Sequence, residues 1–168
     1  MTRTTKAVML LLLAGVAMGQ VKLTLPDSTA VPGSSMVVPI SVENFRHVGS
    51  FSLTIAFDKD VLTYTGISNP PKVGIFNATP IANANSNGAV AMSWFNVSPA
   101  LNIPKGKLLD LNFTYKKGTS ALTFVKMIPS SVTDSLANSL PTTVKNGKVS
   151  ARVVRQGPKK AKVPTGVK

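Results

Sequence analysis

Side chains capable of acid–base or metal chemistry are scarce in this sequence. Its 168 residues include six Asp and Glu in total, one His and no Cys. The closest carboxylate pair is Asp58 and Asp60, and the histidine, His47, has no other potential ligand near it in the sequence. A turn after a strand, in which an Asp accepts hydrogen bonds from backbone N–H groups, explains the pair better than a metal site does. We expect no metal ligands here, and we expect His47 to lie in a solvated loop.

The serines offer no better case for catalysis. No Gly-x-Ser-x-Gly elbow surrounds any of them, and no glycine-rich phosphate loop is present. Zero cysteines exclude disulfides, thiolate nucleophiles and cysteine-ligated metals. The sequence therefore predicts a protein that is not an enzyme and has no catalytic residues, cofactor or metal.

Trp94, the sole tryptophan, has two readings. An exposed tryptophan can stack on sugar rings, whereas a buried one packs the core. At the period of a strand, Trp94 shares a face with Val90 and Met92, while Ser93 and Phe95 lie on the opposite face. This pattern favours the core, although a sugar platform stays open at this point.

The elements that position these residues are predicted to be short strands. Ser50–Phe57 alternates strictly, with small polar side chains on one face and large apolar ones on the other. Further strands are expected at 21–25, 36–43, 61–67, 72–77, 89–95, 107–115, 121–127 and 142–154. Loops are expected at 47–49, 79–88, 96–104 and 129–140. Pro39 indicates an edge or a bulge, and Asn146-Gly147 a turn or a bulge.

The two ends of the chain differ from its body. Arg3 and Lys6, an apolar run and small residues before Gln20 are typical of a signal peptide over residues 1–19, cleaved between Gly19 and Gln20. We expect a secreted protein, extracellular or periplasmic, with no membrane span. Much of the formal charge of +13 lies in the last residues, and we expect a disordered basic tail at 155–168. Nucleic acid is not expected as a partner, because no aromatic side chains interleave the tail lysines.

The order of these features resembles the cohesin domain over nearly all of 21–153. The matching features are the Pro32-Gly33 turn before a Val-rich strand, the Phe57-Asp58 end of the alternating strand with Val61-Leu62 after it, and Asn146-Gly147 within the last strand. The resemblance implies an all-β fold over residues 20–154: a nine-stranded jelly-roll β-sandwich, similar to cellulose-binding modules. It implies a dockerin-type module on a secreted protein as the partner, in polysaccharide degradation or extracellular assembly.

By the same resemblance, the partner would bind the polar face of the alternating strand and its neighbours. The predicted partner-binding residues are Ser50, Ser52, Thr54, Ser93 and Phe95. A polysaccharide-binding module of the same fold and a structural or adhesion domain of the cell envelope are the alternatives. We expect the protein to be a monomer.

Overall fold

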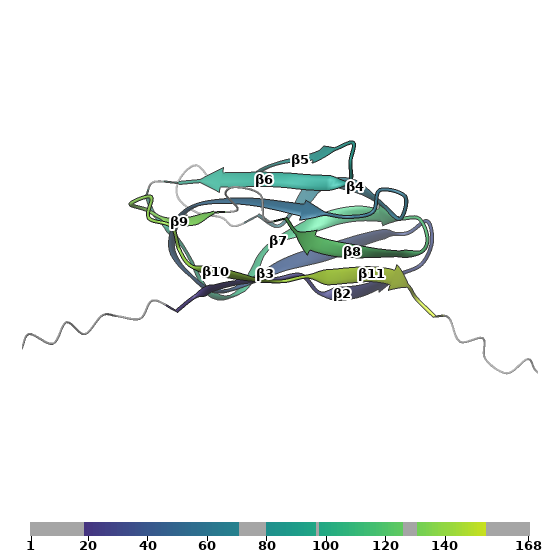
Figure 1. Ribbon diagram of the computed structural model, residues 1–168, viewed down its shortest axis with the longest axis horizontal. Coiled ribbons are helices and arrows are strands. Elements are labelled where there is room, and N and C mark those ends of the chain that lie inside the picture. The colour runs from purple at the N-terminus through teal and green to yellow at the C-terminus, as the bar shows by residue number, and fades with distance from the viewer. Residues whose placement is uncertain (1–18, 71–79, 97, 126–130, 154–168) are drawn as a thin grey trace, which may run out of the picture.

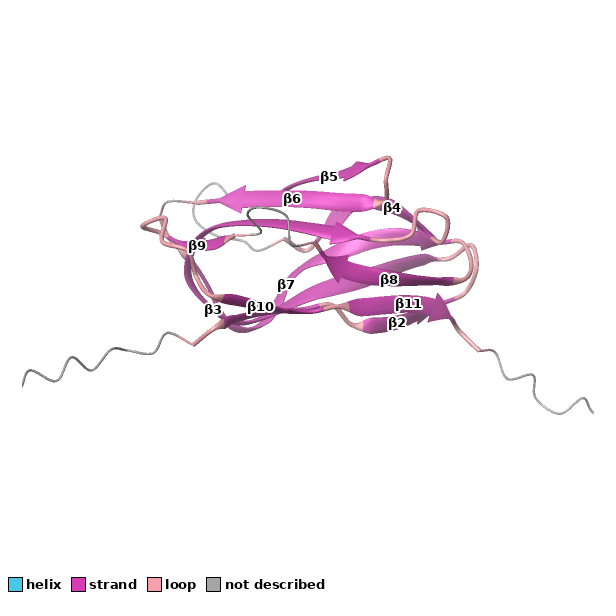
Figure 2. Ribbon diagram, viewed as in Figure 1, coloured by secondary structure: helices cyan, strands magenta, loops and turns pink. Residues whose placement is uncertain are grey.

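The computed structural model describes residues 19–70, 80–96, 98–125 and 131–153, and every regular element in these ranges is a β-strand (Figure 2). The strands are β1 (Val21–Thr24), β2 (Asp27–Ala30), β3 (Ser35–Ala56), β4 (Leu62–Ser68), β5 (Ile81–Asn85), β6 (Ala89–Phe95), β7 (Leu101–Tyr115), β8 (Thr119–Phe124), β9 (Val132–Asp134), β10 (Thr142–Lys145) and β11 (Gly147–Ala151). The all-β jelly-roll sandwich expected from the sequence is confirmed, and the described ranges contain eleven strands where nine were expected.

The long strand β3 belongs to both layers of the sandwich (Figure 1). Its first half pairs with β1 and β7, and its second half pairs with β6, β8 and β9. Between the halves, Asn44 and His47 have positive φ values of 56° and 52°, and the pairing with β7 shifts register between Phe45 and Val48. The chain thus turns a corner without leaving the strand. The sequence-based prediction of a loop over 47–49 was wrong because a bulge can bend a strand without interrupting it.

Near both ends of the chain, the polypeptide crosses from one layer of the sandwich to the other, between β1 and β2 and again between β10 and β11. β1 pairs with β10 and β3, whereas β2 pairs with β11, which in turn pairs with β8. The crossing of the last strand is at Asn146-Gly147, where a Cβ on Gly147 would overlap the carbonyl oxygen of Pro26. Asn146 accepts a hydrogen bond from the backbone N–H of Phe124 through its Oδ1 atom, at 3.0 Å. The predicted irregularity here is therefore Asn146, which belongs to neither β10 nor β11 and lets the chain change layer between them.

Pro39 lies at a stretch of β3 that pairs with β7 on one side only, since β1 reaches no further than Ser41. A register shift follows at once, between Ile40 and Ser41. The missing N–H of proline costs no ladder hydrogen bond at such a position, as predicted.

Apolar side chains from both layers form one continuous core. The alternating strand contributes the four residues expected to anchor it, all buried: Phe51, Leu53, Ile55 and Phe57. Aromatic pairs join the layers, with the rings of Phe57 and Phe113 5.2 Å apart and edge to face. The opposite face of the second half of β3 is consequently left at the surface.

Other differences from the predicted elements are local. β5 and β9 occupy stretches expected to be loops, and β7 begins at Leu101 within another expected loop. The expected strand at 72–77, the end of the strand at 121–127, most of the signal peptide and the basic tail lie outside the described residues.

Candidate functional site

Four strands present an outer surface on which small side chains, many of them polar, predominate. β6 lies between β5 and the second half of β3, and β9 pairs with β3 on its other side. We call this surface the serine face. Its outward residues are Ile81 and Asn83 of β5, Ala91, Ser93 and Phe95 of β6, Ser50, Ser52 and Thr54 of β3, and Thr133 of β9.

The register places the five predicted partner-binding residues together on the serine face. Ser52 stands opposite Ser93, Ser50 opposite Phe95, and Thr54 opposite Ala91. The side chains of Ser52, Ser93 and Phe95 are exposed, and those of Ser50 and Thr54 are half-buried. Each of these three cross-strand pairs therefore has at least one exposed residue that a partner could contact.

Apolar groups stand out of this polar surface at one end. Phe95 is 76% exposed and Ile81 is 68% exposed. Ile81 is directly opposite Ser93, so it is the diagonal neighbour of Phe95 across β5 and β6. Leu136, 80% exposed, lies in the turn after β9. Exposed large apolar side chains that lie close together are typical of interaction surfaces.

The β9 strand and its turn are held rigidly against β3. The hydroxyl groups of Ser50 and Thr133 are 2.7 Å apart and hydrogen-bonded. In the turn, the Asp134 carboxylate accepts hydrogen bonds from the backbone N–H groups of Leu136 and Asn138 and from the Asn138 side chain. The bond from the Asn138 side chain contributes most to lowering the pKa of Asp134 below its usual value, partly offset by desolvation. The carboxylate therefore accepts its hydrogen bonds within the turn, and the outward residues named above for the serine face include no acid.

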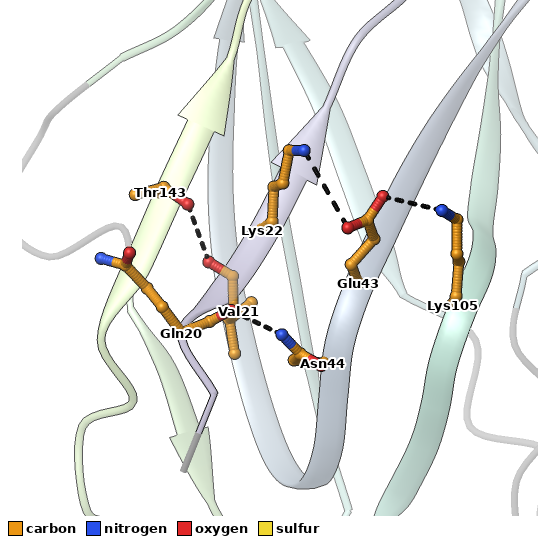
Figure 3. Close-up of polar contacts among 7 residues, drawn as sticks. All are labelled: Gln20, Val21, Lys22, Glu43, Asn44, Lys105 and Thr143. Carbon is orange, nitrogen blue, oxygen red and sulfur yellow. Dashed lines mark hydrogen bonds and ion pairs between the residues drawn. The ribbon is translucent and has the colours of Figure 1, made fainter. Parts of the chain in front are cut away.

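The other layer contrasts with the serine face in charge. On its outer surface Glu43 of β3 lies between Lys22 of β1, with N–O 3.9 Å, and Lys105 of β7, with N–O 3.3 Å (Figure 3). No outward residue of the serine face is charged, by contrast. Removing water from charged side chains when an interface forms costs more free energy than removing it from small neutral side chains.

A buried carboxylate reinforces the charged layer. Asp110 of β7 is 4% exposed, and its Oδ2 atom accepts hydrogen bonds from Lys107 Nζ and from Asn69 Nδ2, both at 2.7 Å. Both partners bind one oxygen, as expected for a structural anion that ties the end of β4 to β7.

The residues considered above for metal binding, catalysis or sugar stacking are part of the fold itself or lie at its surface without such partners among the described residues. Asp60 N–H donates to Asp58 Oδ1 at 2.8 Å, which is the predicted turn. Trp94 is 3% exposed and stacks on Phe51 with ring centroids 5.6 Å apart, so the core interpretation is confirmed. His47 is exposed at the corner of β3. Within the described ranges, no three His, Cys, Asp or Glu residues gather in a way that could hold a metal ion.

Two surface residues escaped the sequence analysis. Ile81 lies in a stretch rich in Asn and Ala that was assigned to a loop, and Leu136 lies in a serine-rich segment. The alternation of Ile81 and Asn83 with alanines was the only signal for β5, and it is weak because alanine fits either face.

Comparison with known proteins agrees with this architecture. The family model described as "Cohesin domain" matches residues 21–151. The chain belongs to the cohesin family. Among curated protein sequences, no match was found.

Several solved cohesin structures share the fold. The cohesin CaCohA2 from Clostridium acetobutylicum is 22% identical, with a TM-score of 0.68 over 79% of this chain and 90% of that one. The sixth cohesin of scaffoldin B from Acetivibrio cellulolyticus, solved with a Cel5 dockerin mutant, is 20% identical, with a TM-score of 0.69 over 79% and 99%. A non-cellulosomal cohesin from Archaeoglobus fulgidus is 19% identical, with a TM-score of 0.66 over 80% and 92%. At these identities the comparison shows the fold alone.

Proposed function

We propose that this cohesin is a non-catalytic module that binds a dockerin-type module of another protein through the serine face. One observation carries the proposal: the outward residues of the face that the structure describes carry no charge, several of them are exposed, and Phe95 and Ile81 project from one end of it. A solved relative in complex with a dockerin supports the class of partner.

The chemistry of the face defines how it would bind. Hydroxyl groups of Ser52 and Ser93 can donate and accept hydrogen bonds, and Phe95 supplies apolar area. Aromatic anchors carry a large share of the energy in protein interfaces. Because no charged side chain of this face is involved, the affinity should depend little on salt concentration.

The experiment first captures the partner protein and then measures its affinity for the wild-type chain and for variants. The chain is immobilised, the secreted fraction of its own organism is passed over it, and retained proteins are identified by mass spectrometry. A retained dockerin-bearing protein is then titrated with the wild-type chain and with three variants: S52K and F95A on the serine face, and T63K on an exposed position of β4.

We expect F95A to weaken binding by about 2 kcal/mol, about thirtyfold in Kd. S52K should weaken it at least tenfold, because it places a charge in the middle of the contact. T63K adds the same charge to the other layer and should bind as the wild type does. Unchanged affinity in both F95A and S52K would move the site elsewhere, and a secreted fraction without dockerin-bearing ligands would refute the partner class.

Export is part of the same proposal. Gln20 is exposed and precedes β1, and its carbonyl oxygen accepts a hydrogen bond from Asn44 Nδ2 at 3.2 Å (Figure 3). Cleavage between Gly19 and Gln20 would therefore leave every strand intact. In the part of the chain that the structure describes, no helix has the length and hydropathy to cross a membrane. N-terminal sequencing of the mature protein should begin at Gln20. A role in polysaccharide degradation would follow from an exported hydrolase as the captured partner.

A further inference from the structure

A groove of about 480 Å³ lies between β2 and the beginning of β3. It shares no residue with the serine face. Four hydroxyl side chains, three apolar ones and a guanidinium form most of its wall: Ser28, Thr29, Ser34, Ser35, Val31, Met36, Val37 and Arg152. Its size is within the usual range for sites that take small ligands.

Of the residues that the structure describes, Arg152 is the only charged one lining the groove. Its backbone N–H donates to the carbonyl oxygen of Ala30 at 2.8 Å, which fixes the residue beside β2. Among the described residues, no carboxylate comes within 4.0 Å of its guanidinium. The nearest acid along β2, Asp27, is paired with Lys148 at 3.8 Å. The guanidinium therefore keeps its donors for a ligand, and an anion is the ligand that it fits.

The other residues that line the groove indicate which kind of molecule bears the anionic group. The Ser34 hydroxyl donates to the carbonyl oxygen of Val31 at 2.7 Å, so its oxygen remains an acceptor. Thr29 and Ser35 are exposed and can both donate and accept. Val37, 54% exposed, offers apolar surface beside them. Neutral hydroxyl groups, one cation and small apolar patches match a sugar ring that bears one carboxylate, whereas an acidic peptide would call for several cations.

We propose that this groove binds a uronate unit of an acidic polysaccharide, with its carboxylate on Arg152 and its hydroxyl groups on the serine and threonine side chains. This site is independent of the serine face. The chain would then hold a protein partner on one surface and an anionic glycan on another.

The test uses the full chain and trigalacturonate as the probe, with binding followed residue by residue by NMR. Cellotriose serves as the neutral sugar and a short poly-glutamate as the acidic peptide. R152Q removes the cation. R46Q is the matched control, because Arg46 is exposed at the corner of β3 and its substitution changes the net charge equally.

We expect trigalacturonate to shift the resonances of Ser35, Val37 and Arg152, and R152Q to weaken its binding at least tenfold while R46Q leaves it unchanged. Cellotriose should bind at least tenfold more weakly than trigalacturonate. Shifts confined to residues 154–168, equal binding by R152Q, or equally tight binding of poly-glutamate in the groove would overturn the proposal. Capture of a protein partner by R152Q should match the wild type, so failure here is distinguishable from failure of the serine face.

Discussion

Replacing Gly49 by alanine tests how tightly β9 is docked onto β3. Gly49 is buried, and a Cβ there would lie 2.6 Å from the carbonyl oxygen of Asp134 and 2.7 Å from the Cα of Ser135. The first distance is about 0.8 Å short of an ordinary contact of 3.4 Å. Both atoms belong to the backbone, so no side chain can rotate away. The conformation of Gly49 is itself accessible to alanine, because its φ is outside the left-handed region.

The overlap can be relieved only by moving the turn after β9. That turn is held by the N–H of Ser135, which donates to the carbonyl oxygen of His47 at 3.2 Å, and by the hydroxyl pair of Ser50 and Thr133. Overpacking of this kind costs about 1–3 kcal/mol. We expect G49A to lower the free energy of unfolding by that amount, with a urea midpoint about 1 M lower.

Urea denaturation followed by tryptophan fluorescence measures the change, since Trp94 is buried in the core. S52A, an exposed position on the same strand, is the control and should stay within about 0.5 kcal/mol of the wild type. A G49A variant as stable as S52A would show that the turn moves freely, and the rigid docking of β9 inferred above would be wrong.

Three further predictions concern polar groups of the fold. D110N should lower the free energy of unfolding by about 1.5–3 kcal/mol, because the buried carboxylate loses its charge-assisted bond to Lys107; chemical denaturation with no change in stability would contradict this. Y115F removes a buried hydroxyl that donates to a turn carbonyl and should cost about 1 kcal/mol by the same assay, whereas a gain in stability would contradict the bond. Because the pKa of Asp134 is lowered in the folded state, its contribution to stability is present above its unfolded pKa of about 4 and is lost as the pH falls through the folded value. In N138A, carboxyl NMR should find the pKa of Asp134 higher than in the wild type, and an identical titration would refute the assigned cause.

The sequence predicts well those elements whose two faces differ strongly. Strict alternation over 50–57 identified both the buried side of β3 and the outward Ser50 and Ser52, and the contrast between Trp94 and Phe95 oriented β6. Where both faces carry small residues, as in the stretch around Ile81, period-two patterning has little contrast, and β5 was missed. The site prediction inherited this gap, since Ile81 completes the apolar end of the serine face.

The groove at Arg152 could not be found from sequence for a different reason. Its residues come from 28–37, where a tight turn joins β2 to β3, and from Arg152, and these two parts of the chain meet only because β2 pairs with β11 in parallel. Parallel pairing of the two ends of a chain leaves no local signal, because neither strand is joined to the other by a turn. The unpaired state of the guanidinium likewise depends on where Asp27 and Lys148 lie in space.

The corner in β3 has consequences for the cooperativity and the rate of folding. A single uninterrupted strand is hydrogen-bonded in both layers, so neither layer can detach while the other stays intact, and thermal melting should be one cooperative transition. Its partners come from distant parts of the sequence, so loop closure precedes most of the energetic gain and folding should be slow, on the order of milliseconds to seconds. The serine face is built on such a strand and is therefore ordered in the free protein, so binding of a partner there, as proposed, would lose little conformational entropy.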